Sequence, residues 1–90
     1  MSSAEDDTLL EFPCEFPIKA MGPSDPDFVL HVLALVRQHV PDVDEQRVST
    51  TSSSRGKYVS VTVTVTATSK QQLNDVYRTL YEDDQVVMTL

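Results

Sequence analysis

The sequence predicts an α+β protein with a ferredoxin-like βαββαβ sandwich, in which two helices cover one face of a four-stranded antiparallel sheet. Three observations lead to this prediction. Apolar and polar residues alternate strictly from Lys57 to Thr68, as in a long strand. Two further segments, one on each side of it in the sequence, have helical apolar spacing and begin with helix-capping residues. Short connections and right-handed crossovers then favour the ferredoxin-like topology.

The first predicted strand runs from Glu15 to Met21 and is followed by a helix. Apolar residues occupy every second position of the strand, and Gly22-Pro23 ends it. The sequence Ser24-Asp25-Pro26-Asp27 then supplies a capping side chain, a first-turn proline and an acid near the positive end of the helix dipole. From Phe28 to Val40 the apolar residues then define a broad helical stripe, and Pro41 ends the predicted helix.

The middle of the chain predicts two more strands joined by a turn. Val43 to Thr51 has charged residues among few apolar ones, which is typical of an edge strand. Ser52 to Gly56 is a turn in which the glycine can adopt positive φ. The strand from Lys57 to Thr68 then has two β-branched faces. One face carries Val59, Val61, Val63, Val65 and Ala67, and the other carries Tyr58, Ser60, Thr62, Thr64, Thr66 and Thr68.

The last part of the chain predicts a second helix and a fourth strand. Ser69-Lys70-Gln71-Gln72 has the spacing of a capping box, and apolar residues three and four apart follow as far as Tyr81. The final strand is expected from Gln85 to Leu90, with Val86, Met88 and Leu90 on one face. Residues 1–8 are expected to be a disordered acidic tail, so that 9–90 form a single domain.

Charge and composition disfavour several classes of function. The chain of 90 residues has a net charge of -7, with 14 acidic and 7 basic residues, which argues against nucleic-acid binding. No apolar run approaches the length of a membrane span, and the acidic N-terminus is unlike a signal peptide, so we expect a cytoplasmic protein that does not bind membranes.

No catalytic, metal or cofactor site is expected from the residue types that usually build one. Cys14 is the single cysteine, so a disulfide within the chain is impossible, and it has no nearby base in sequence. His31 and His39 lie two turns apart on the first helix, which is too far to ligate one metal in the manner of an i, i+4 pair. The sequence therefore predicts a protein that is not an enzyme and holds neither metal nor cofactor.

Two candidate binding regions remain. In this topology the loop after the first strand lies at the same end as the serine-rich turn, where a helix N-terminus and Arg55 favour an anion while Asp25 and Asp27 favour an amine. A zwitterionic small ligand would suit both, and the alternative is a plain capped helix beside a polar turn. The candidate ligand residues are Met21, Gly22, Ser24, Asp25, Arg55, Gly56 and Tyr58.

The second candidate region is the face of the sheet that the helices leave bare. Its central strand presents hydroxyl-bearing side chains, which suit an interface with a protein partner or a second copy of the chain. A solvated sheet face is the alternative, because threonine is a good strand former that tolerates water. The candidate interface residues are Ser60, Thr62, Thr64 and Thr66.

The chain also resembles a known family. Leu9-Leu10-Glu11-Phe12-Pro13, Lys19-Ala20-Met21-Gly22, Ser53-Ser54-Arg55-Gly56-Lys57-Tyr58 and the Val86-Val87-Met88 ending are similar to segments of the YbeD-like family of small uncharacterised bacterial proteins. The resemblance implies a fold similar to the ACT regulatory domains and no established enzymatic activity. ACT domains bind an effector near the loop after the first strand, commonly at a dimer interface, which implies a site at Met21, Gly22, Ser24 and Asp25.

These observations favour a non-enzymatic regulatory or adaptor protein that binds a protein partner or a small ligand. ACT domains normally regulate an attached enzyme, so regulation by this chain is expected to act in trans. One alternative is a structural homodimer. Another is a small acylphosphatase-type enzyme, but that chemistry needs a glycine-rich loop and an arginine after the first strand. Here that loop, from Met21 to Asp25, has one glycine and no arginine.

Overall fold

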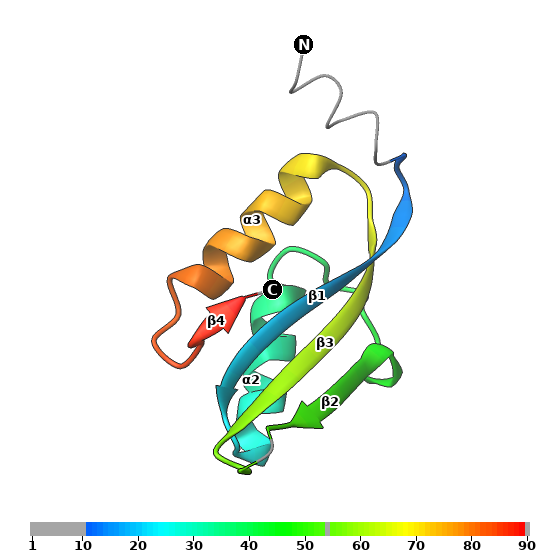
Figure 1. The fold of residues 1–90 in the computed structure, drawn as a ribbon. Coiled ribbons are helices and arrows are strands. Elements are labelled where there is room, and N and C mark those ends of the chain that lie inside the picture. The colour runs from blue at the N-terminus through cyan, green and yellow to red at the C-terminus, as the bar shows by residue number, and fades with distance from the viewer. Residues whose placement is uncertain (1–10, 54, 90) are drawn as a thin grey trace.

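The structure is a computed structural model that describes residues 11–53 and 55–89 (Figure 1). The acidic tail predicted over 1–8, and the predicted apolar residues Leu9 and Leu10, lie outside this range. The elements are β1 (Cys14–Pro23), α2 (Pro26–Arg37), a 3-10 helix η1 (Glu45–Arg47), β2 (Val48–Ser52), β3 (Tyr58–Ala67), α3 (Lys70–Tyr81) and β4 (Met88–Thr89).

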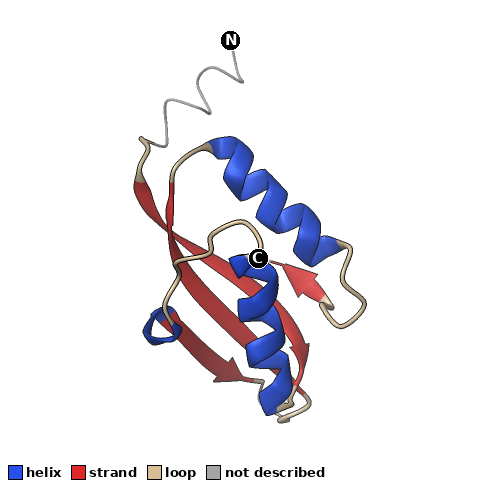
Figure 2. Ribbon diagram, turned by 180° about the vertical axis from the view of Figure 1, so that it is seen from behind, coloured by secondary structure: helices blue, strands red, loops and turns tan. Residues whose placement is uncertain are grey.

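The four strands form one antiparallel sheet in the order β2-β3-β1-β4. The two central strands pair along their whole length, from Cys14 opposite Ala67 to Pro23 opposite Tyr58. Both long helices lie on the same face of this sheet, as the view from behind shows (Figure 2). This arrangement confirms the ferredoxin-like βαββαβ sandwich predicted from the sequence.

The core lies between the helices and one face of the two central strands. The predicted valine face of β3 is buried along its whole length, and Ile18 and Ala20 of β1 are completely buried beside it. The opposite face of both strands has no helix over it (Figure 1). The helices complete the core with Phe28, Val32, Leu33 and Val36 from α2 and Leu73, Val76 and Leu80 from α3.

Each helix begins at the residue type that its sequence predicts. The Asp25 carboxylate caps α2 by accepting a hydrogen bond from the Asp27 amide at 2.9 Å. Ser69 caps α3 by accepting one from the Gln72 amide at 3.1 Å. The Gln72 side chain reaches back one residue further than in a regular capping box, because its Oε1 accepts from the Thr68 amide at 2.8 Å. Both predicted helix starts are therefore confirmed.

The segment between α2 and β2 differs from the prediction. The helix ends at Arg37 rather than Val40, and β2 begins at Val48 rather than Val43. The Arg37 guanidinium group donates two hydrogen bonds to the Val43 carbonyl, at 3.0 and 2.9 Å, and so holds the intervening loop against the helix. The Val43 side chain is buried, but it enters the core from this loop instead of from a strand.

The last strand also begins later than predicted, because among the described residues after Gln85 only Met88–Thr89 pairs with β1. Met88 lies opposite Met21 on the open face, and Val86 packs against the core before the strand begins. The prediction that Val86 and Met88 share a face is therefore wrong. The third residue of that predicted face, Leu90, lies outside the described residues.

Candidate functional site

The loop after β1 and the hairpin between β2 and β3 meet at one end of the sheet (Figure 1). The Ser24 amide donates a hydrogen bond to the Lys57 carbonyl at 3.1 Å, and Pro23 pairs with Tyr58. Gly56, in the hairpin turn, has a φ of 72°, a left-handed conformation that favours glycine. The structure therefore brings the seven predicted ligand residues to one end of the molecule.

The interior of this end is already filled by the protein itself. The Phe28 ring lies where a side chain on Gly22 would be, and the Gln85 carbonyl oxygen closes the space from the other side. The Asp25 carboxylate is engaged in capping α2. What remains is a shallow hollow of about 190 Å³ lined by Ser24, Asp25, Pro26, Val29 and Val59.

The predicted ligand residues are divided between this hollow and the open face. Ser24 and Asp25 line the hollow, but Arg55 does not and extends from the exposed turn. Met21 and Tyr58 belong to the alternating series that faces away from the helices, so they lie on the open face of the sheet. The seven residues therefore lie near one another but do not line a common cavity.

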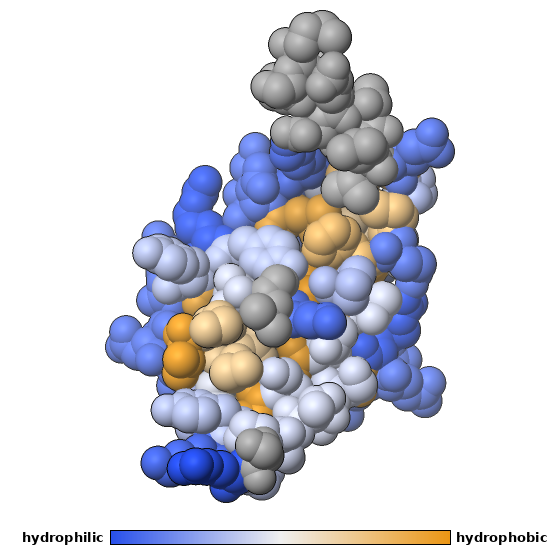
Figure 3. Space-filling view, in the orientation of Figure 1, coloured by the Kyte–Doolittle hydropathy of each residue, from blue (hydrophilic) through white to orange (hydrophobic). Residues whose placement is uncertain are grey.

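The open face carries all four predicted interface residues in one row along β3. Thr62 lies between Lys19 of β1 and Ser49 of β2, and Ser60 lies between Met21 and Thr51. Figure 3 views this face, and its central part has the pale colours of residues with intermediate hydropathy. The row consists of Ser60, Thr62 and Thr64, which are half-buried by neighbouring side chains, and Thr66, which is exposed.

Charged side chains of both signs border the open face. Arg47 forms an ion pair with Glu15, and the second carboxylate oxygen of Glu15 accepts a hydrogen bond from the Thr66 hydroxyl at 2.8 Å. Lys19 is exposed further along β1, and two aspartates of the loop before η1 line a hollow that Thr66 also borders. A partner that binds across this face therefore meets hydroxyl groups at its centre and charges of both signs at its margin.

An exposed apolar patch, here called the β4 patch, borders the open face on the side of the short strand. Its members are Met21, Tyr81, Val87 and Met88, and the last three have 83, 59 and 50% of their surface exposed. Figure 3 shows apolar colour gathered beside β4. A shallow hollow of about 320 Å³ is lined by Tyr81, Val86, Val87, Met88 and Thr89. The sequence pattern predicted a strand here but not its exposure, for which the apolar run Val86-Val87-Met88 was the available signal.

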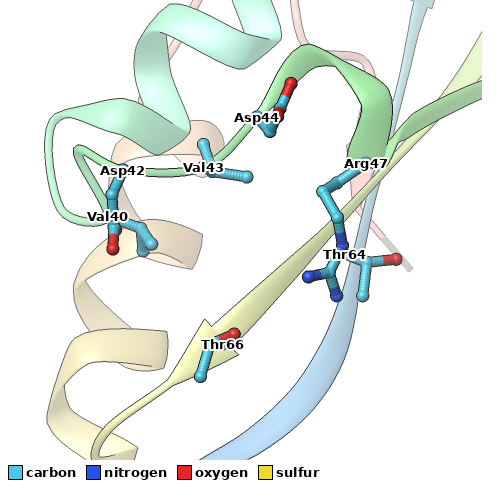
Figure 4. A pocket seen from close by; sticks show the side chains of 7 residues that line it. All are labelled: Val40, Asp42, Val43, Asp44, Arg47, Thr64 and Thr66. Atoms are coloured by element: carbon cyan, nitrogen blue, oxygen red, sulfur yellow. The ribbon is translucent and has the colours of Figure 1, made fainter.

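A third hollow, of about 220 Å³, lies where β2 begins beside the middle of β3 (Figure 4). The Arg47 side chain extends over Thr64, and the loop before η1 supplies the opposite wall. The charged residues here are not among the site residues predicted from the sequence. Asp44 caps η1 and Arg47 is paired with Glu15, so neither offers an uncommitted catalytic group. The hollow is lined by Val40, Asp42, Val43, Asp44, Arg47, Thr64 and Thr66.

The titratable side chains on the other face hold the helices together. His31 contacts the Asp83 carboxylate at 2.8 Å, and His39 contacts the Thr79 hydroxyl at 2.7 Å, so each histidine links α2 to the α3 region. Burial raises the pKa of Tyr77, which packs edge-on against Phe16. Residues 11–53 and 55–89 contain no group of three or more metal-ligating side chains, and none of their helices is long and apolar enough to cross a membrane.

Comparisons with known proteins place this chain in a bacterial family. Residues 7–90 match the family model described as "Protein of unknown function (DUF493)". A UPF0250 protein of Paraburkholderia phytofirmans is 48% identical over 88 residues, covering 98% of this chain and 99% of the relative. A UPF0250 protein of Chromobacterium violaceum is 46% identical over 88 residues, with the same coverage of both chains.

A solved structure shares the fold. The solution structure of protein HP0495 from H. pylori superposes with a TM-score of 0.69 over 90% of this chain and 85% of that chain, at 18% sequence identity. The resemblance to the YbeD-like proteins is confirmed by the relatives that match nearly the whole chain. The chain therefore belongs to the DUF493 family of uncharacterised proteins, together with the UPF0250 proteins of these bacteria.

Proposed function

We propose that this domain is a non-catalytic regulatory or adaptor module of the cytoplasm that binds a protein partner across the open face of its sheet. The observation that carries the proposal is a row of hydroxyl-bearing side chains on β3, here called the hydroxyl row, which consists of Ser60, Thr62, Thr64 and Thr66. The row lies on the face of the two central strands that the helices leave open. Uncovered sheet faces in small domains commonly serve as interaction surfaces.

The composition of this face supports a protein partner. Hydroxyl groups donate and accept hydrogen bonds without the desolvation cost of a charge. Methionine and aromatic residues are enriched at protein interfaces, and Met21, Met88 and Tyr58 lie at the end of the face nearest the hairpin. Glu15, the acid that β1 contributes to the face, is already paired with Arg47.

A small ligand at the loop after β1 has less support. Phe28 occupies the space beside Gly22, and the Asp25 carboxylate is committed to the α2 cap. An acylphosphatase-type reaction has less support still, because Arg55 is exposed in the turn and does not line the hollow at the α2 N-terminus. A non-enzymatic role therefore fits this geometry best.

The proposal is tested by affinity capture with matched variants of the immobilised domain. Thr64→Lys places a long cation in the middle of the hydroxyl row, whereas Asn74→Lys adds the same charge at an exposed position of α3. A partner that is captured by the native chain and by Asn74→Lys, lost with Thr64→Lys, and bound again as a purified protein supports the proposal. Capture that is equal for both variants contradicts it.

A thermal-shift screen with amino acids and nucleotides distinguishes the small-ligand alternative. Stabilisation that persists in Thr64→Lys but disappears when Arg55 is replaced would favour a ligand site at the hairpin end. The same screen verifies that Thr64→Lys remains folded, which is necessary before lost capture is interpreted.

A further inference from the structure

The sheet has two outer edges and an uncovered stretch of β1, and they are protected to different degrees. Among the described residues, β4 is two residues long. Beyond it, no strand of the described part of the chain lies beside the β1 stretch from Glu15 to Ile18 on that side. Pro17 lies in the middle of this stretch, and proline has no amide hydrogen with which to pair an added strand. Short length and proline are two ways in which proteins prevent edge-to-edge association.

The β2 edge has neither form of protection. Its five residues, Val48-Ser-Thr-Thr-Ser52, contain no proline and no charge, and the last four are exposed. The Ser53 amide donates to the Tyr58 carbonyl at 2.9 Å, so the backbone groups of Ser53 point toward β3. Because this direction alternates along an antiparallel strand, the backbone groups of Thr51 and Ser49 point toward β3 as well. The amides and carbonyls of Thr50 and Ser52 therefore point away from the sheet, toward solvent.

We propose that this edge pairs with the β2 edge of a second copy of the chain, antiparallel and centred on Thr50, to form a dimer with a continuous eight-stranded sheet. The proposal stands apart from the proposed function, which concerns the face of the sheet and not its edge. In this register Thr50 lies opposite Thr50 of the partner subunit, and Val48 lies opposite Ser52 of the partner subunit. The numbers of any two opposed strand residues therefore add up to one hundred.

The backbone groups at the edge fit this register. Thr50 directs both its amide and its carbonyl outward, so two copies exchange a pair of hydrogen bonds at the two-fold axis. The Val48 amide is already bonded to the Glu45 carbonyl, but the Val48 carbonyl points outward with those of Thr50 and Ser52. It can therefore accept from the Ser52 amide of the partner subunit.

The charges that flank the edge favour a second copy in the antiparallel direction. Asp44 and Glu45 precede β2, whereas Arg55 and Lys57 follow it. Arg47 also precedes the strand, but its charge is paired with Glu15, so the edge is acidic at its beginning and basic at its end. An edge with this polarity complements itself only when the two copies run in opposite directions, which brings the acidic start of one edge near the basic end of the other.

The helical side of the edge offers an apolar surface for the same contact. A hollow of about 330 Å³ lies between α2 and β2, and Figure 2 shows the helix alongside this edge of the sheet. Leu30 borders the hollow and leaves 59% of its surface exposed. A two-fold axis through Thr50 brings the two hollows together and buries both leucines. The hollow is lined by Val29, Leu30, Leu33, Glu45, Val48, Ser49 and Thr50.

Sedimentation equilibrium from micromolar to millimolar protein tests the dimer. Thr50→Pro removes the outward amide without removing a bond to β3 and is expected to give a monomer. Glu45→Arg brings two positive charges together at each of the two symmetry-related contacts. It is expected to raise the dissociation constant of the dimer on the order of tenfold. The double variant Glu45→Arg/Arg55→Glu is expected to recover the dimer. Glu82→Arg, at the end of α3, makes the same charge change away from the edge and is expected to have no such effect.

Cysteine crosslinking tests the register, in a Cys14→Ser background. Directly opposed residues of paired strands have Cα atoms about 5.5 Å apart, within the range of a disulfide. Thr50→Cys meets its own copy and is expected to crosslink under mild oxidation, whereas Thr51→Cys faces Ser49 of the partner subunit and is expected to crosslink far less.

Three results would each overturn the proposal: a native chain that stays monomeric at millimolar concentration, a dimer unaffected by both Thr50→Pro and Glu45→Arg, or equal crosslinking at the two cysteine positions. Thr64→Lys changes the open face and is expected to leave the dimer intact. Failure of the edge dimer and failure of partner binding at the face are therefore separable.

Discussion

Gly22 and Phe28 form the tightest fit at the hairpin end of the domain. The Phe28 ring is completely buried and lies in the space that a side chain at position 22 would need. The glycine is thus required for a close approach between β1 and α2, although its neighbourhood in the sequence suggests a ligand loop.

Gly22→Ala is expected to lower the free energy of unfolding by about 1–3 kcal/mol, because the added methyl group overlaps a buried ring and the Gln85 carbonyl. Urea denaturation followed by circular dichroism measures this loss. Gly56→Asn is the matched control, because Gly56 has open space around it and asparagine tolerates its positive φ. An equal loss in both variants would show that the space beside Gly22 does not matter.

The two faces of β3 are expected to respond very differently to truncation. Val63 is completely buried, so Val63→Ala should cost about 2–3 kcal/mol through lost apolar contact and a residual cavity. Thr62→Ala, one residue earlier on the open face, should change stability by no more than about 0.5 kcal/mol. Chemical denaturation of both variants checks the prediction, and a large loss with Thr62→Ala would contradict an uncovered face.

Gln72 connects three parts of the chain. Its Oε1 accepts from Thr68, and its Nε2 donates to the His39 carbonyl at 3.1 Å, which ties the start of α3 to the end of α2. Gln72→Ala is expected to cost about 1–2 kcal/mol, because the partly buried His39 carbonyl and the exposed Thr68 amide both lose their partner. Gln71→Ala removes a neighbouring side chain that bonds only an exposed carboxylate, and it should be nearly neutral. Thermal unfolding of the pair is the measurement, and equal melting temperatures would disprove the role of Gln72.

Alkaline pH is expected to destabilise the fold through Tyr77. Burial raises the pKa of Tyr77 above its ordinary value of 10.0 because the ionised ring loses solvation. The folded chain therefore retains this proton more tightly than the unfolded chain. The resulting stability is fully present below pH 10 and is lost as the pH rises through the folded-state pKa.

Unfolding free energies measured between neutral pH and pH 11 test this prediction. Tyr77→Phe is expected to flatten the alkaline part of the profile, whereas Tyr81→Phe, at a position that is 83% exposed, is expected to leave it unchanged. A profile that is the same for the native chain and Tyr77→Phe would show that another group is responsible.

Much of the candidate site could be predicted because it depends on strand alternation. Once Lys57 to Thr68 was assigned to a central strand, the positions of Thr62 and Thr64 on one face and Val61 and Val63 on the other followed from the period of two. The β4 patch could not be predicted in the same way. The exposure of Val87 depends on where the last segment begins to pair with β1, and in the described part of that segment the pairing begins at Met88.

The sequence by itself determined which side chains share a face and where the helices begin, because apolar periodicity and capping depend on residues a few positions apart. The tertiary structure alone decided which backbone groups find partners. Val43 enters the core from a loop because Arg37 holds that loop in place, and β2 is left with an unpaired edge because no other strand within 11–53 and 55–89 extends beside it. These outcomes arise from contacts between segments that are distant in the sequence or from the position of a strand in the sheet, which local patterns do not encode.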